Sequence, residues 1–297
     1  MIDHYALRDT ALDDADDAPE QQHDDELTPP TRAAIGIDIG GTGIKGAVVN
    51  LETGELLSKR KKFSTPEGAE PEDVLSAVME LSDKLRKHKS IRGSDHVEIG
   101  ICLPSIVRHG VTHSAANISK RWLGLHAEHL FSDGLGQAVA LANDADAAGL
   151  GEQRFGAAHG RLDSVLVTTL GTGIGTALVH GGHLFPNTEL GHLELDGHAD
   201  YERFASARAR KIENLNFEAW GARLTPYYRK LEQLFCPDVF ILSGGISKQA
   251  EEFLHLIEVQ TPIIPAALRN NAGIIGAAIL ADEAASLRAD ADTPPTH

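Results

Sequence analysis

The chain carries the tetrapeptide Gly-Thr-Gly-Ile twice, as residues 41–44 and again as residues 171–174. Each copy follows a short apolar run and opens a second one, which is the pattern of a strand, a turn and another strand. Glycines in such a turn allow positive φ angles and let backbone N–H groups approach a phosphate without a Cβ in the way. The repeat therefore predicts two phosphate-binding hairpins that face one cleft, with a phosphoryl donor as the ligand.

Two familiar nucleotide motifs do not fit the first copy. A Walker loop places Lys and Ser/Thr directly after its last glycine, whereas Lys45 lies inside the second apolar run. A dinucleotide fingerprint needs glycines that open a helix, but residues 44–49 are too short and are followed by a turn at 52–54. One such hairpin alone would be read as an ordinary tight turn, and phosphate binding is predicted only because the hairpin occurs twice.

Length and composition suit two folded domains and an acidic tail. The 297 residues are 42% hydrophobic, enough to bury two modest cores. The first thirty residues hold ten acidic side chains and one arginine, and so account for −9 of the net charge of −16. They predict a solvated, disordered tail. The remainder is mildly acidic without a basic face, which argues against nucleic acid as a partner.

Cysteine content and hydropathy predict a cytoplasmic protein. Cys102 and Cys236 both lie in apolar stretches and are expected to be core residues, without a disulfide framework. The N-terminus lacks the apolar core of a signal peptide, and no apolar run approaches the ~20 residues of a membrane span. No membrane partner is expected.

Apolar runs that alternate with helical patterns predict the α/β class. A helix is expected to begin at Pro71, where apolar residues repeat at helical spacing through residue 85. Because a hairpin opens each half, the two halves are expected to be duplicated lobes. The predicted organisation is a disordered tail over 1–32, a small lobe over 33–142, a large lobe over 143–272, a helix over 273–289 that packs back on the small lobe, and a second disordered tail over 290–297.

Asn143 and Asp144 directly follow an apolar strand and precede a helix rich in small residues. Ligands of open α/β sheets bind at the carboxyl ends of strands, where these side chains would lie. There Asp144 can accept a proton from a substrate hydroxyl while Asn143 fixes that hydroxyl, as in kinases. An Asn or Asp ahead of a helix is also a common N-cap, and the pattern alone leaves both interpretations open.

A second polar group contains Glu189 and His192, with Glu202 nearby. Carboxylates and imidazole supply the paired acceptors and donors that hold sugar hydroxyls. A metal site built from His183, His192 and His198 is the competing interpretation. Their loose spacing, with no thiolate near them, favours sugar binding over zinc.

Several ordered motifs together resemble the sugar kinases of the ROK family (repressors and kinases), most closely their polyphosphate glucokinase branch. The resemblance runs from about residue 35 to residue 278. It rests on motifs at residues 37–46, 115–117, 143–149, 170–175, 189–192, 243–247 and 273–278.

The resemblance implies two RNase H-like lobes of the actin/hexokinase superfamily around a central cleft. It implies a homodimer that phosphorylates glucose to glucose 6-phosphate with inorganic polyphosphate, and with ATP as a possible second donor. Asp144 matches the general base, and Asp38 matches the acid that steers Mg²⁺ through water. Sugar-contacting positions match Asn117, Asn143, Asp144, Glu189, His192 and Glu202. Phosphate-binding positions match Gly40, Gly41, Thr42, Gly43, Lys45, Gly171, Thr172 and Gly173.

The chain departs from the general ROK pattern in two places. The family usually has a zinc-binding cysteine cluster between residues equivalent to Gly191 and Glu202, but no cysteine lies there. The resemblance therefore implies no structural zinc, as in the polyphosphate branch. Pro104-Ser105 stands where the family usually has Pro-Gly, and we expect the small serine to be tolerated.

Three alternatives remain at this level. A strictly ATP-dependent ROK glucokinase or other hexose kinase would share the same glycine loops. A sugar-sensing repressor would need a basic helix-turn-helix, whereas the N-terminal segment is short and acidic. A chaperone-like or cytoskeletal ATPase would have no use for the sugar-binding groups.

A polyphosphate chain would need cations leading out of the cleft, for which the candidates are Lys120, Arg121, Arg203, Arg208, Arg210 and Lys211.

Overall fold

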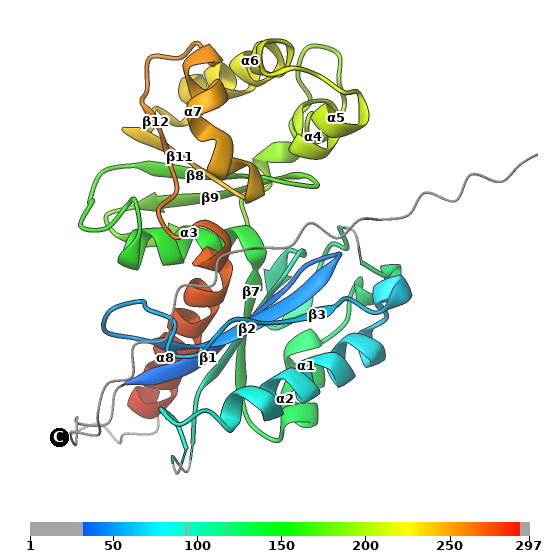
Figure 1. The fold of residues 1–297 in the computed structure, drawn as a ribbon, viewed down its shortest axis with the longest axis vertical. Coiled ribbons are helices and arrows are strands. Elements are labelled where there is room, and N and C mark those ends of the chain that lie inside the picture. Colours follow the sequence, from blue (N-terminus) through cyan, green and yellow to red (C-terminus); the bar gives the residue numbers. More distant parts are fainter. Residues whose placement is uncertain (1–31, 93, 95, 117, 292–297) are drawn as a thin grey trace, which may run out of the picture. The chain divides into compact units, whose positions relative to one another are not determined.

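The computed structural model describes residues 32–291, apart from residues 93, 95 and 117 (Figure 1). The predicted acidic tail, except for Arg32, and residues 292–297 of the second tail lie outside the described residues. So does the predicted sugar contact Asn117. Residues 290 and 291, which were expected to be disordered, form the end of the last helix.

The first sheet has the strand order β3-β2-β1-β4-β7. β1 and β2 form the first predicted hairpin, and β3 extends it antiparallel, while β4 and β7 run parallel to β1. The strands span Ala33–Ile39 (β1), Gly43–Asn50 (β2), Lys61–Ser64 (β3), Ile99–Leu103 (β4) and Val139–Asn143 (β7).

The second sheet repeats this plan in the order β10-β9-β8-β11-β12. Its first three strands are again antiparallel, and β11 and β12 run parallel to β8. The strands span Val165–Leu170 (β8), Ile174–His180 (β9), His183–Phe185 (β10), Val239–Ser243 (β11) and Ile263–Pro265 (β12). Two sheets with one topology confirm the predicted duplication. A separate small hairpin joins β5 (Val107–Arg108) and β6 (Val111–Thr112).

Helices cover the sheets in layers (Figure 1). α1 and α2 pack on the first sheet, and α3 and α8 pack on each other. α8 also packs against the first sheet, and α3 packs against strands of both sheets, while α6 packs with α4 and α7 on the second half. The helices span Pro71–Arg86 (α1), Ala127–Leu135 (α2), Asp144–Phe155 (α3), Glu202–Ala205 (α4), Ala207–Ile212 (α5), Phe217–Phe235 (α6), Ala250–Phe253 (α7) and Ala272–Ala291 (α8). Short 3₁₀ turns span Glu67–Ala69 (η1), Lys120–Trp122 (η2), Leu190–His192 (η3), Gly245–Gln249 (η4), Leu254–Leu256 (η5) and Arg269–Asn271 (η6).

The predicted helix α1 shows how the sequence sets an element. Pro71 stands at its first position, where the missing N–H costs nothing. Val74, Val78 and Leu81 are fully buried, so one apolar face packs on the first sheet while the charged face meets solvent.

Helix α8 approaches the first sheet so closely that only glycine fits beneath it. A Cβ on Gly36 of β1 would lie 1.9 Å from the carbonyl oxygen of Ile274, and one on Gly100 of β4 would lie 1.7 Å from that of Ala277. Gly276 makes a similar approach to Ala147 of α3. These contacts bring the first residues of α8 to the end of the cleft described below.

One of the two cysteines differs from expectation. Cys102 is buried in β4, as predicted, but Cys236 is exposed. Cys236 is the C-cap of α6 and lies in the left-handed region, with a φ of 43°. Within the described ranges, no helix is both long and apolar enough to cross a membrane.

Candidate active site

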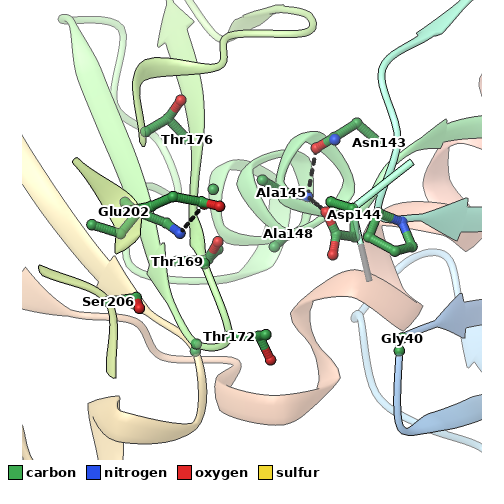
Figure 2. A pocket seen from close by; sticks show the side chains of 18 of the residues that line it. Gly40, Asn143, Asp144, Ala145, Ala148, Thr169, Thr172, Thr176, Glu202 and Ser206 are labelled. Atoms are coloured by element: carbon green, nitrogen blue, oxygen red, sulfur yellow. Dashed lines mark hydrogen bonds between the residues drawn. The ribbon is translucent and has the colours of Figure 1, made fainter. Parts of the chain in front are cut away.

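A cleft of about 1020 Å³ gathers residues from both halves of the chain (Figure 2). The turns of both glycine hairpins, the start of α3 and the start of α8 contribute to its walls. The predicted site residues that line it are Asp38, Gly40, Gly41, Thr42, Lys45, Asn143, Asp144, Gly171, Thr172, Gly173, Glu189, His192 and Glu202. Gly43 does not line the cleft, because it begins β2 and is buried.

The two glycine turns are similar but not equal. Ile39 pairs with Ile44 in the first hairpin and Leu170 pairs with Ile174 in the second, so the first turn is one residue longer. In each, the first glycine N–H donates to the carbonyl of the last glycine at 3.0 Å.

The expected positive φ angles are absent from these glycines. Gly173 is required for another reason. The Glu202 side chain approaches it so closely that a Cβ at this position would lie 2.2 Å from a carboxylate oxygen of Glu202. A Cβ on Gly171 would meet nothing within 4 Å. The space beside the Gly171 Cα is therefore open to a ligand, although its N–H and its carbonyl already have hydrogen-bond partners within the protein.

Asn143 caps helix α3. Its side-chain oxygen accepts from the backbone N–H groups of Ala145 at 2.8 Å and Asp146 at 3.1 Å, and its amide donates to the carbonyl of Ser105 at 3.2 Å. The N-cap interpretation is thus confirmed for Asn143. Asp144 is the first helical residue, and Figure 2 shows its side chain in the cleft, with Glu202 across from it.

The environment of Asp144 favours its neutral form. Burial, followed by the negative charges of Asp38 and Glu189, raises the pKa of Asp144 to about 7. The hydrogen bond that Oδ1 accepts from Ala145 N at 2.9 Å opposes this shift. A carboxylate with a pKa near neutral is a stronger base than an ordinary aspartate and is suited to take a proton from a hydroxyl.

The rate of catalysis should follow the ionisation of this carboxylate. Because folding raises the pKa of Asp144 to about 7, the basic form is lost as the pH falls through 7. We expect kcat/KM for the hydroxyl substrate to drop about tenfold per pH unit below roughly pH 6 and to level off above roughly pH 8. A pH–rate profile measures this limb, and a flat profile down to pH 5 would contradict the assignment.

Asp38 and Lys45 face each other across β1 and β2. The two residues are paired in the sheet, and Lys45 Nζ lies 3.4 Å from Asp38 Oδ2. The Asp38 side chain remains 18% exposed, so one face of its carboxylate stays open to the cleft. Lys45 is therefore partly committed to Asp38 and lines the same wall.

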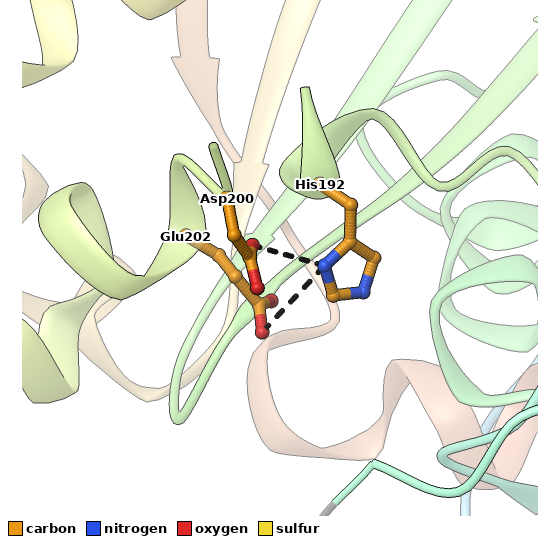
Figure 3. Close-up of side chains that lie close together, drawn as sticks. All are labelled: His192, Asp200 and Glu202. Carbon is orange, nitrogen blue, oxygen red and sulfur yellow. Dashed lines mark hydrogen bonds and ion pairs between the residues drawn. The ribbon is translucent and has the colours of Figure 1, made fainter. Parts of the chain in front are cut away.

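His192 stands among three carboxylates, and Figure 3 shows two of them, Asp200 and Glu202. Its Nδ1 lies 3.0 Å from Asp200 Oδ1 and 4.0 Å from Glu202 Oε1, and its Nε2 lies 3.7 Å from Glu189 Oε2. Burial lowers the pKa of His192, but the Asp200 hydrogen bond and the neighbouring negative charges outweigh it and raise the pKa overall. Burial also raises the pKa of Glu189. The cluster therefore offers both donors and acceptors to a polar ligand.

Glu202 is fixed by a backbone contact. Its Oε2 accepts from Ile174 N at 2.9 Å, directly after the second glycine turn. One possible metal-ligand atom from each of His192, Asp200 and Glu202 lies within 4.8 Å of the other two, so these three side chains could also hold a cation. The three-histidine metal site considered from the sequence does not form, since His198 stacks on Phe204 instead, with ring centroids 3.8 Å apart.

Asp200 is a cleft residue that the sequence did not single out. It binds His192 through Oδ1, and its Oδ2 accepts from Arg203 Nε at 2.9 Å. Arg269 and Asn270 also line the cleft from η6 and were equally missed. An acidic residue two positions before Glu202 was the only available signal for Asp200.

Comparison with known proteins agrees with this geometry. Residues 34–209 match the family model described as the ROK family. The chain belongs to the ROK family. A polyphosphate glucokinase of Mycobacterium tuberculosis (strain CDC 1551 / Oshkosh) is 43% identical over 249 residues, which cover 84% of this chain and 91% of that protein.

Solved ROK structures share the fold. The inorganic polyphosphate/ATP-glucomannokinase from Arthrobacter sp. strain KM is 48% identical, with a TM-score of 0.80, covering 86% of this chain and 99% of that one. A ROK family glucokinase from Streptomyces griseus, solved with glucose and AMPPNP, is 26% identical with a TM-score of 0.69, covering 84% and 99%. The chain thus has the duplicated α/β fold of the ROK sugar kinases, as predicted.

Proposed function

We propose that this protein transfers a phosphoryl group from inorganic polyphosphate to glucose, forming glucose 6-phosphate. The observation that carries the proposal is the position of Asp144, whose carboxylate lies in one cleft with both glycine turns and the Glu189–His192–Glu202 group. A base, a sugar-binding set and two anion-binding turns are the parts that such a transfer needs. The similarity to polyphosphate glucokinases supports the choice of both substrates.

Each group has a defined role in the proposed reaction. Glu189, His192 and Glu202 hold sugar hydroxyls, and Asp144 accepts the proton of the attacking hydroxyl as its oxygen bonds to phosphorus. The bond from phosphorus to the next bridging oxygen of the donor breaks, and the shortened polyphosphate leaves. Backbone N–H groups of the glycine turns stabilise the charge on the transferring group.

Asp38 fits a role beside a divalent cation. It is a partly exposed carboxylate on the cleft wall, with its charge close enough to Asp144 to raise the pKa of that group. Mg²⁺ bound with the donor would neutralise phosphate charge, and Asp38 would orient its water ligands. We also propose ATP as a second donor, since the Arthrobacter relative is described as a polyphosphate/ATP-glucomannokinase.

The cations proposed to guide polyphosphate divide into two groups. Lys120, Arg203 and Arg208 line the cleft. Arg121 instead pairs with Glu72, and Arg210 lies over the ring of Phe217 at 3.9 Å. Lys211 is exposed but is not part of the cleft wall. The channel that we propose therefore contains fewer cations than the sequence suggested. Arg208 lies next to the second turn, where its backbone N–H donates to Gly171 O at 3.0 Å.

Replacing Arg208 should weaken the binding of the phosphoryl donor more than the binding of the sugar. A charge-assisted phosphate contact is worth about 1.5–3 kcal/mol, so Arg208→Gln is expected to raise the KM for polyphosphate about tenfold or more. The KM for glucose should change less than about twofold, and the salt dependence of polyphosphate affinity should become shallower. Steady-state kinetics at several salt concentrations measures both.

Lys230→Gln provides a matched control, because it removes one positive charge from α6, whose residues do not line the cleft. It should leave both KM values unchanged. Equal effects of the two variants, or an unchanged polyphosphate KM in Arg208→Gln, would exclude the channel through Arg208.

Two further properties complete the proposal. We propose a homodimer in the cytoplasm, on the ground of the family resemblance and of the cysteine usage described above. Neither property is needed for the assignments of residues in the cleft.

A further inference from the structure

The segment that carries Glu189 is tied to the rest of the fold through Asn187. The backbone N–H of Asn187 donates to Asp146 Oδ2 of helix α3 at 2.7 Å. Its side-chain oxygen accepts from Val107 N at 2.9 Å, and its side-chain amide donates to Val107 O at 3.0 Å. One residue thus joins α3 to the β5–β6 hairpin and satisfies both backbone groups of Val107.

Thr176 of β9 fixes the other end of the same segment. Its hydroxyl donates to Thr188 O at 2.7 Å and accepts from Leu190 N at 3.2 Å, while the Thr188 hydroxyl donates to Thr176 O at 2.9 Å. Residues on both sides of Glu189 are therefore held by hydrogen bonds, Thr188 before it and Leu190 after it. Its carboxylate is presented to the cleft by a segment that is rigidly held on both sides.

The partner of Asn187 belongs to the same helical turn as the general base. Asp146 is only 2% exposed and lies two residues after Asp144. Its Oδ2 is used by Asn187, and its Oδ1 has no hydrogen-bond partner among the residues that the structure describes. Burying a carboxylate costs free energy, and this cost must be offset by contacts that the buried group makes. The side-chain contact that Asp146 makes is the hydrogen bond to the Asn187 backbone.

The backbone of Asn187 suits its residue type. Its φ of 60° lies in the left-handed region, which Asn adopts more readily than most residues with a side chain. Glycine would adopt it as easily but would lack the amide that binds Val107. The position therefore requires both the unusual backbone and the side chain.

We propose that Asn187 is a positioning residue, which keeps Glu189 in register with Asp144 by joining α3 to the β5–β6 hairpin. The inference rests on the proposed function, because a sugar held by Glu189 must present one hydroxyl to Asp144. A displacement of about 1 Å in such a constellation can cost about 100-fold in rate. The bonds to Val107 and Asp146 restrict that displacement.

The decisive variant is Asn187→Gly, which removes both amide hydrogen bonds and keeps the left-handed backbone unstrained. Asn214→Gly is the matched control, since Asn214 also has a positive φ, of 49°, but is exposed and is not part of the cleft. In Asn187→Gly, the KM for glucose should rise about tenfold, with the KM for polyphosphate within about twofold of the wild type. Asn214→Gly should leave both values unchanged.

A second readout separates positioning from loss of stability. The kcat/KM for glucose is compared with the kcat/KM for each of its monodeoxy analogues, and the loss for an analogue is called its penalty. Glu189→Gln identifies the analogue whose penalty depends on Glu189. Asn187→Gly should reduce the penalty for that same analogue and leave the other penalties intact. A merely structural role would lower the melting temperature without changing the penalties selectively.

Asn187→Asp decides the matter if the glycine variant does not fold. It keeps the size and the acceptor for Val107 N but loses the donor to Val107 O, so a smaller increase in the glucose KM is expected. A glucose KM within twofold of the wild type in both folded variants, or penalties that change uniformly, would overturn the proposal. A wild-type protein that binds no glucose in calorimetry would instead reject the proposed function itself.

Discussion

Asp144→Asn is expected to reduce kcat for glucose phosphorylation by about 10³-fold, within the range of 10²- to 10⁴-fold that general bases supply. The amide keeps the shape of the side chain, and its oxygen can still accept from Ala145 N. It cannot accept a proton from the sugar, because the amide is not basic. The dissociation constant for glucose should change less than about tenfold, since the other sugar-binding groups remain.

Two control measurements test whether a loss of kcat comes from weaker sugar binding or from unfolding. Calorimetric titration with glucose and a thermal melt show whether Asp144→Asn binds sugar and folds like the wild type. Removing a buried carboxylate with a raised pKa relieves an unfavourable burial, so the melting temperature should not fall. A folded variant that keeps more than a tenth of the wild-type kcat would show that another group takes the proton.

Glu152→Ala is expected to lower the free energy of unfolding by about 3–5 kcal/mol. Glu152 is fully buried, and its Oε2 accepts from Ala157 N at 2.7 Å and Ala267 N at 3.0 Å, while Oε1 accepts from Leu268 N at 2.8 Å. Its removal leaves three backbone donors without their partner, and each such group costs about 1–3 kcal/mol. Urea denaturation measures the change.

The control is Glu194→Ala, which removes an exposed carboxylate of the same charge. It should change the free energy of unfolding by less than about 0.5 kcal/mol. Because Glu152 holds residues 267 and 268 just before Arg269 in the cleft, Glu152→Ala should also weaken donor binding. An equal stability in the two variants would show that the buried carboxylate is not a structural hub.

The main elements of the fold could be predicted from the sequence, because their signals are local. The two glycine hairpins predicted β1, β2, β8 and β9, the apolar run before Asn143 predicted β7, and helical spacing predicted α1. The duplicated glycine turns predicted two similar sheets. The edge strands β3, β10 and β12 were missed, because they are short and two of them carry largely exposed residues. β12 also pairs with β11, from which η4, α7 and η5 separate it in the sequence.

The site was predicted where residue type alone signals chemistry. Asp144, Glu189, His192 and Glu202 meet in the cleft as the motifs indicated. Asp200 was missed, because its role depends on the folding of residues 192–202 around His192. The reason for Gly173 was also wrong, since it depends on the Glu202 side chain rather than on φ. Asn117 stays a prediction.

The most direct test of the account is the formation of glucose 6-phosphate by the purified wild-type protein with Mg²⁺ and either polyphosphate or ATP, beside Asp144→Asn. We expect rapid formation with polyphosphate, slower or comparable formation with ATP, and near-complete loss in the variant with both donors. Activity with ATP alone would contradict the polyphosphate assignment and leave the site intact. No product with either donor would contradict the central claim that this cleft phosphorylates glucose.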